Sequence, residues 1–205
     1  ESKAGEKRVA LLPDSISKLT KAGLSVSIES GAGIHAGASD ESYREIGASI
    51  FSSTDQRKEL ASADVILSVQ PLSPDQASSL KSGVITISFL SSVSAKESID
   101  ALAKSGATAF SLEALPRISR AQSMDVLSSQ ANIAGYKAVM LAADVYKRFM
   151  PMLMTAAGTV KAARVMVLGA GVAGLQAIAT AKRLGAMVEA SDVRPAVKEQ
   201  IESLG

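Results

Sequence analysis

The segment RVMVLGAGVAGLQAIATAKRLGAMVEASDVR, residues 164–194, constrains the fold more than any other part of the chain. It predicts a strand, a glycine-rich turn, a helix and a second strand that ends on Asp192. In the turn, Gly169 permits a tight bend, Gly171 lets the backbone approach a pyrophosphate, and Gly174 permits close packing of the helix on the strand. The phosphates would then lie at the positive N-terminal end of the helix.

A dinucleotide is the predicted ligand of this turn, with a purely structural glycine turn as the alternative. The glycines alone are weakly specific. Here, however, a strand precedes them, a helix that starts at Val172 follows them, and Asp192 lies about 20 residues on, where ribose hydroxyls are expected. The carboxylate favours NAD because it would repel the 2′-phosphate of NADP. Val193 and Arg194 complete the predicted adenosine side, with Arg194 at the rim of the pocket or in solvent.

Short apolar and β-branched runs alternate with capped helical patterns in the first part of the chain. The predicted strands are 8–12, 24–30, 64–69, 83–90 and 107–113, and the predicted helices lie within 13–23, 39–48, 53–63 and 94–106. Such alternation implies an α/β fold with a doubly wound parallel sheet.

Two Rossmann-like, doubly wound parallel-sheet domains joined by a long helix are therefore expected. The alanine-rich stretch 119–149 predicts one or two helices, because few helix breakers interrupt it. We assign residues 1–118 to an N-terminal α/β domain, 119–159 to a loop and connecting helix, and 160–205 to the first half of a nucleotide-binding Rossmann domain. The second domain is thus expected to be truncated.

Composition excludes several classes of protein. A formal charge of +2 is too small and dispersed for a nucleic-acid surface. The chain has no cysteine and one histidine, His35, which excludes a disulfide framework, a thiolate metal site and a multi-histidine metal site. No metal site is expected. No apolar run reaches the roughly 18 residues that a membrane-spanning helix needs, so no direct membrane insertion is expected.

A second feature is PRISRAQSMDVLSSQANIAGY, residues 116–136, which follows a predicted strand. The carboxyl ends of strands are where α/β sheets bind ligands. A ligand-binding loop and a solvated loop with a helix cap both fit these residues. The polar and charged side chains in question are Arg117, Arg120, Gln122, Asp125, Ser128, Ser129, Gln130 and Asn132.

Three segments, 117–139, 149–186 and 191–205, resemble the NAD(H)-binding domain I of the proton-translocating NAD(P) transhydrogenases, in the alpha-subunit component. The resemblance covers essentially the whole chain, including the N-terminal segments that this family shares with alanine dehydrogenase. In the family, a loop with Arg, Gln and Asp at offsets of five and eight closes on the nicotinamide. The matching and flanking residues here are Arg117, Ile118, Ser119, Gln122, Asp125 and Ser128.

The resemblance implies direct hydride transfer between NADH and NADP⁺ in a Si/Re-specific, proton-translocating enzyme. Gln122 would hydrogen-bond the carboxamide of the nicotinamide, and a pairing of Arg117 with Asp125 would shape the loop. NADP(H) would bind a partner component, without which this component is inactive, and a membrane-spanning component would couple the reaction to proton movement. A homodimer is implied, peripheral to the cytoplasmic face of a bacterial inner membrane, or on the mitochondrial matrix side in a eukaryote.

Alanine dehydrogenase is the main alternative, because that family shares both domain types. Its substrate-binding arginine corresponds to Arg8, but its catalytic lysine falls at Gln70 and its histidine at Ser91. Neither replacement supplies the titrating group that reductive amination needs. His35 lies in a glycine-rich stretch typical of a loop and does not substitute. A catalytically silent nucleotide-binding fragment is the remaining alternative.

Overall fold

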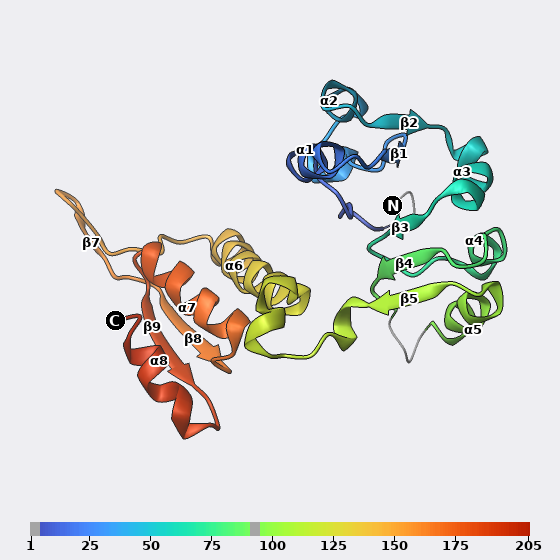
Figure 1. Ribbon diagram of the computed structural model, residues 1–205. Coiled ribbons are helices and arrows are strands. Elements are labelled where there is room, and N and C mark those ends of the chain that lie inside the picture. The colour runs from blue at the N-terminus through green and yellow to red at the C-terminus, as the bar shows by residue number, and fades with distance from the viewer. Residues whose placement is uncertain (1–4, 91–94) are drawn as a thin grey trace. The chain divides into compact units, whose positions relative to one another are not determined.

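The chain folds into two compact units, Glu1–Met124 and Asp125–Gly205, each of which is visible in the computed structural model (Figure 1). The structure describes residues 5–90 and 95–205. Parallel strands alternate with helices in both units, which confirms the predicted α/β class. The division at residues 118 and 159 that the sequence suggests stays a prediction.

The first unit begins with a small parallel pair of strands. Ser27 lies opposite Ser49 in this pair, and Tyr43 is fully buried together with Ile16. The Tyr43 hydroxyl donates to the Leu11 carbonyl at 2.8 Å, which fixes the chain before the first helix. The elements are α1 (Pro13–Lys21), β1 (Ser27–Glu29), η1 (Ile34–Ala36), α2 (Asp40–Glu45), β2 (Ser49–Phe51) and η2 (Ser53–Asp55).

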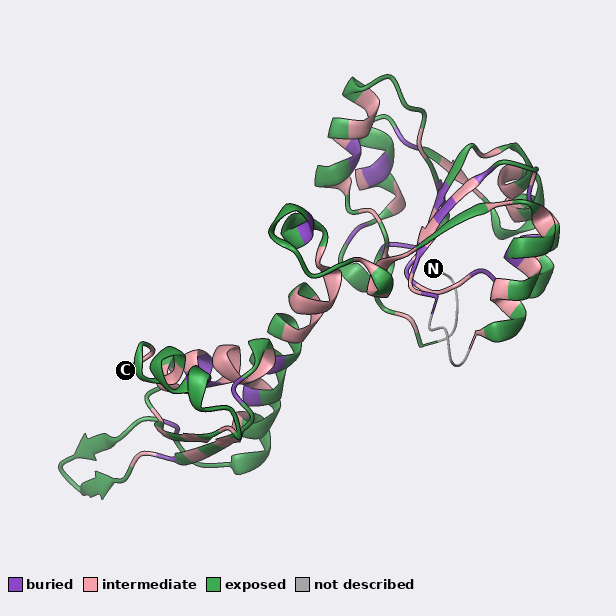
Figure 2. Ribbon diagram, turned by 60° about the horizontal axis from the view of Figure 1, so that its bottom comes forward, coloured by how far each residue is buried: buried purple, intermediate pink, exposed green. Residues whose placement is uncertain are grey.

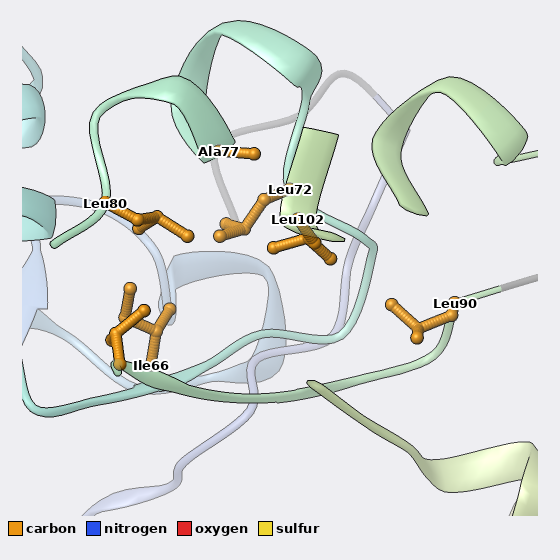
Figure 3. Packing of buried hydrophobic residues seen from close by; sticks show 7 residues of the cluster. Ile66, Leu72, Ala77, Leu80, Leu90 and Leu102 are labelled. Atoms are coloured by element: carbon orange, nitrogen blue, oxygen red, sulfur yellow. The ribbon is translucent and has the colours of Figure 1, made fainter. Parts of the chain in front are cut away.

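The first unit continues into a three-stranded parallel sheet of order β3-β4-β5. Its elements are α3 (Gln56–Ser62), β3 (Val65–Leu67), α4 (Pro74–Ser78), β4 (Ile85–Ser88), α5 (Lys96–Ser105), β5 (Thr108–Ser111), η3 (Leu112–Ala114) and η4 (Ser119–Met124). Aliphatic side chains from β3, α4, α5 and the loops between them converge on one core (Figure 3). Removing these side chains from water is the main source of stability for this sheet.

The second unit places a parallel strand pair beside two helices. Its elements are α6 (Val126–Tyr146), β6 (Leu153–Thr155), β7 (Gly158–Val160), β8 (Arg164–Leu168), α7 (Val172–Arg183), β9 (Met187–Ser191), η5 (Pro195–Val197) and α8 (Lys198–Glu202). Strands β8 and β9 pair in parallel along five residues each. Helix α6 packs along α7 (Figure 1), and Gly135 is its buried contact point with the backbone of Ala173.

Most elements fall inside the predicted ranges, but the strand predicted at 8–12 is wrong. The Arg8 backbone N–H donates to the Glu6 carboxylate at 2.9 Å, and Val9 and Leu11 pack against the core around Ile16. Side-chain bonding and packing therefore satisfy this segment without a strand partner.

Three elements escaped prediction: β2, α4 and the antiparallel hairpin of β6 and β7. Each is short. The hairpin is exposed along both strands (Figure 2), so it lacks the alternating burial that marks a strand in a sequence.

Within residues 5–90 and 95–205, the structure contains no helix of the length and apolar character needed to cross a bilayer.

Candidate dinucleotide site

Strand β8 leads into the glycine turn, and the turn is tied to the neighbouring strand. Gly169 has φ of +95°, a conformation that favours glycine. Its N–H donates to the carbonyl of Ser191 at 2.8 Å, so the turn continues the pairing of β8 with β9. This bond fixes the turn at the carboxyl end of the strand pair, where parallel sheets bind ligands.

The other two glycines differ in the space around them. A Cβ at Gly174 would lie in severe overlap with the Gly169 carbonyl oxygen and 2.8 Å from its carbonyl carbon, so α7 approaches β8 as closely as a backbone can. A Cβ at Gly171 would meet nothing within 4 Å. The turn therefore packs tightly on its inner side and leaves open space at Gly171, where a pyrophosphate is predicted to approach.

Helix α7 begins at Val172 without a side-chain cap on its first turn, because the N-cap residue is Gly171. The first N–H groups of a helix lack partners within the helix and carry the positive end of its dipole. In twelve residues of helix, this end is the natural position for an anionic group.

Asp192 follows β9 directly and faces the glycine turn. Its Oδ2 accepts from the Ala170 N–H at 2.7 Å, and its side chain is only 6% exposed. The Arg194 guanidinium, with the N–H groups of Ala170 and Arg194, holds the pKa of Asp192 well below its usual range. The carboxylate is therefore charged at neutral pH and lies beside the turn, as the sequence predicts. Val193, next in the chain, is almost fully exposed.

Four residues of the predicted nicotinamide loop, Arg117, Ile118, Ser119 and Gln122, are exposed in or just before η4. The loop is anchored by the buried Ala121, whose N–H donates to the Ile118 carbonyl at 2.9 Å. These four residues belong to the unit that ends at Met124. Their participation in one site with the glycine turn stays a prediction, as does the pairing of Arg117 with Asp125.

Asp125 and Ser128 lie in the second unit and bind each other. The Asp125 carboxylate caps α6 by accepting from the Ser128 N–H at 2.9 Å and from its hydroxyl at 2.7 Å. The helix cap that the sequence allows is therefore present for this pair. A cap does not exclude contact with a ligand, since a carboxylate has further acceptor positions.

Replacing Asp125 with alanine is expected to lower the free energy of unfolding of the second unit by about 1 kcal/mol, because the Ser128 N–H loses its acceptor. Asp125→Asn keeps an acceptor oxygen and is expected to retain most of the cap. Urea denaturation followed by circular dichroism compares the two variants. Equal losses of stability would contradict the capping role.

The positions that correspond to the alanine dehydrogenase site form a hydrogen-bonded network around Glu6. The Arg8 guanidinium donates to both Glu6 oxygens at 2.8 Å, and Gln70 Nε2 donates to Oε2 at 2.6 Å. Arg8 also lies over the Phe89 ring, 5.9 Å from its centroid. The bonds from the Arg8 side chain hold the pKa of Glu6 far below its usual range, against the opposing effect of burial. Arg8 and Gln70 are thus part of a structural network.

The other two residues of that comparison carry less information. Ser91 lies outside the described residues. His35 is exposed in η1, in agreement with its interpretation as a loop histidine.

Two residues of structural importance are not singled out by the sequence patterns above. Glu6 could have been found as an acid two residues before Arg8. Gly135 could have been found as a glycine inside a long helix, where glycine costs stability unless a close contact needs it. A Cβ at Gly135 would overlap the Ala173 carbonyl oxygen.

Comparison with known proteins agrees with this geometry. The sequence profile of the family described as alanine dehydrogenase/PNT, N-terminal domain matches residues 1–134, and that of the C-terminal domain matches residues 138–205. The chain is 50% identical over its whole length to the first portion of the NAD(P) transhydrogenase alpha subunit of Rhodospirillum rubrum, and it covers 54% of that protein.

A solved structure of transhydrogenase from Sinorhizobium meliloti superposes with a TM-score of 0.93 at 51% identity, over 100% of this chain and 60% of that one. Alanine dehydrogenase of Mycobacterium tuberculosis is more distant, with 31% identity over 94% of this chain and 52% of its own length. The chain spans about half the length of the curated relatives it matches.

Proposed function

The chain belongs to the alanine dehydrogenase/PNT family, and on this premise we propose that it is the NAD(H)-binding component of an NAD(P) transhydrogenase. One observation carries the proposal. The Ala170 N–H bond holds the Asp192 carboxylate at a glycine turn with open space beside Gly171, which suits an adenosine ribose next to a pyrophosphate. The higher identity to transhydrogenase subunits than to alanine dehydrogenase supports the choice of activity.

In the proposed Si/Re-specific reaction, a hydride moves from C4 of the dihydronicotinamide of NADH to C4 of the nicotinamide of NADP⁺. NADH is oxidised and NADP⁺ is reduced, and no proton is exchanged with a side chain. The protein has to position the rings and exclude water. Gln122 orients the carboxamide of NADH, and Arg117, Ile118, Ser119, Asp125 and Ser128 border the ring in the closed loop. Gly169, Gly171, Val172, Gly174, Asp192, Val193 and Arg194 hold the adenosine and pyrophosphate side.

Asp192→Asn is expected to weaken NADH binding about tenfold and NADPH binding much less. The change removes the charged acceptor for the ribose hydroxyls, and it also removes the negative charge that repels a 2′-phosphate. Calorimetric titration of the full-length protein with each nucleotide measures both effects. Glu199→Gln removes one negative charge from the exposed helix α8 and serves as the control. Equal weakening of NADH and NADPH would argue against the ribose role.

NADP(H) binds a separate partner component in this proposal, and a membrane-spanning component couples hydride transfer to proton translocation. This component is inactive alone and peripheral to the membrane, at the cytoplasmic face in a bacterium or on the matrix side in a mitochondrion. Adding the NADP(H)-binding component to the full-length protein tests the assignment. A catalytically silent nucleotide-binding role would give NADH binding but no hydride transfer under these conditions.

A homodimer is also part of the proposal. The hairpin of β6 and β7 supports it, because a two-stranded hairpin is marginally stable alone and this one exposes apolar side chains on both strands (Figure 2). Met154 is 72% exposed. Contact with a second copy would remove this apolar surface from water.

Pyruvate, ammonia and NADH are expected to give no alanine dehydrogenase turnover above background. Gln70 stands in the place of the catalytic lysine and donates to Glu6, and an amide does not titrate as that reaction requires. Absorbance of NADH at 340 nm follows the assay, with an authentic alanine dehydrogenase as the positive control. Clear turnover would overturn the choice of activity within the family.

A further inference from the structure

The Asp192 carboxylate is fully hydrogen-bonded within the chain. Oδ1 accepts from the Arg194 N–H at 2.8 Å and from Arg194 Nε at 3.0 Å. Oδ2 accepts from the Ala170 N–H at 2.7 Å and from Arg194 Nη2 at 3.0 Å. A carboxylate has about four lone-pair positions, so these four bonds occupy it. A ribose hydroxyl can therefore reach Asp192 only by replacing one of the present donors.

Two of these donors are fixed and two are mobile. The Ala170 N–H belongs to the glycine turn, and the Arg194 N–H belongs to the backbone two residues after Asp192. The Arg194 guanidinium, in contrast, arrives on a long side chain that is 58% exposed, while the carboxylate it covers is 6% exposed. Exposed ion pairs contribute little net stability. The guanidinium is thus the donor that a ligand displaces at least cost.

We propose that Arg194 is a specificity-determining residue, whose guanidinium covers Asp192 in the empty site and is displaced by the ribose diol of NADH. This inference rests on the proposed function, because it takes NADH as the nucleotide bound at Asp192. Arg194 has two effects. It competes with the ribose hydroxyls for the carboxylate, and its positive charge offsets the repulsion between Asp192 and a 2′-phosphate. Arg194 therefore makes the preference for NADH over NADPH smaller than Asp192 alone would make it.

Arg194→Gln tests the proposal in the full-length protein against Lys198→Gln as a matched control. Lys198 begins the neighbouring helix α8, is 78% exposed and pairs with Glu202 at 3.7 Å. Both variants lose one exposed, ion-paired cation, but only one uncovers Asp192. We expect Arg194→Gln to bind NADH about two- to five-fold more tightly than Lys198→Gln. The ratio of the NADPH to the NADH dissociation constant should rise in Arg194→Gln and stay unchanged in the control.

A double variant tests whether the effect passes through Asp192. In an Asp192→Asn background, the added Arg194→Gln change is expected to leave NADH affinity unchanged, because no carboxylate remains to be uncovered. Persistence of the effect in this background overturns the inference, as does equal NADH affinity of the two single variants. NADH binding that is insensitive to Arg194 leaves the proposed function standing, whereas no NADH binding by any form of the protein overturns both.

Discussion

Gly174→Ala is expected to lower the free energy of unfolding of the second unit by about 3 kcal/mol. The added methyl group would overlap the Gly169 carbonyl oxygen, and both sides of this contact are backbone, so no side chain can move aside. Relief requires α7 to shift from β8 or the glycine turn to open. Native-state hydrogen exchange of the α7 and β8 amides resolves this loss within the second unit.

Gly171→Ala is the matched control for Gly174→Ala. Gly171 has φ of −76°, and a methyl group on its Cα would have no neighbouring atom within 4 Å, so alanine fits without strain. Stability should therefore stay within about 0.5 kcal/mol of the wild type. NADH affinity should nevertheless fall, because the methyl group occupies the space predicted for the pyrophosphate. Wild-type stability in Gly174→Ala would contradict the close-packing argument, and unchanged affinity in Gly171→Ala would contradict the placement of the phosphates.

Gln122→Ala is expected to slow hydride transfer about a hundredfold while NADH affinity changes about twofold or less. The amide can donate and accept at once, as the nicotinamide carboxamide requires, so its loss misorients the ring without removing the contacts that bind the adenosine side. Single-turnover stopped-flow of the reconstituted complex measures the chemical step, and titration measures affinity.

Ser123→Ala changes the next exposed residue of the same η4 and is the control for Gln122→Ala. Gln122→Asn keeps the amide on a shorter side chain and should show an intermediate rate. If hydride transfer in Gln122→Ala matches that of Ser123→Ala, the assignment of this loop to the nicotinamide is wrong.

The sequence predicts the strand, turn and helix around Gly169 well because their determinants are local. A β-branched run, three glycines and an acid at fixed spacing leave few alternatives, and β8, α7 and β9 form within the predicted segment. Where the determinants are not local, prediction fails. The run at 8–12 has strand composition, but the Glu6 carboxylate takes its Arg8 N–H, and no local pattern reveals that bond.

The candidate site shows the same limit at the scale of side chains. The position of Asp192 follows from spacing, whereas its bond to the Ala170 N–H depends on how the turn folds back onto β9. The sequence places Arg194 at the rim or in solvent. It is more than half exposed, yet its guanidinium donates to both Asp192 oxygens. Exposure follows from residue type, but the choice of partner requires the backbone geometry of the loop.

Two consecutive residues of α7 are each held by a backbone contact, Ala173 by Gly135 of α6 and Gly174 by Gly169 of the turn. Side chains ordinarily absorb small displacements by changing rotamer, but these contacts leave none to do so. The first turn of α7 is thus immobilised by folding itself, with its N–H groups already aimed at the open side of Gly171. A nucleotide arriving there meets donors whose ordering entropy was lost when the protein folded, which leaves more of the interaction energy for affinity.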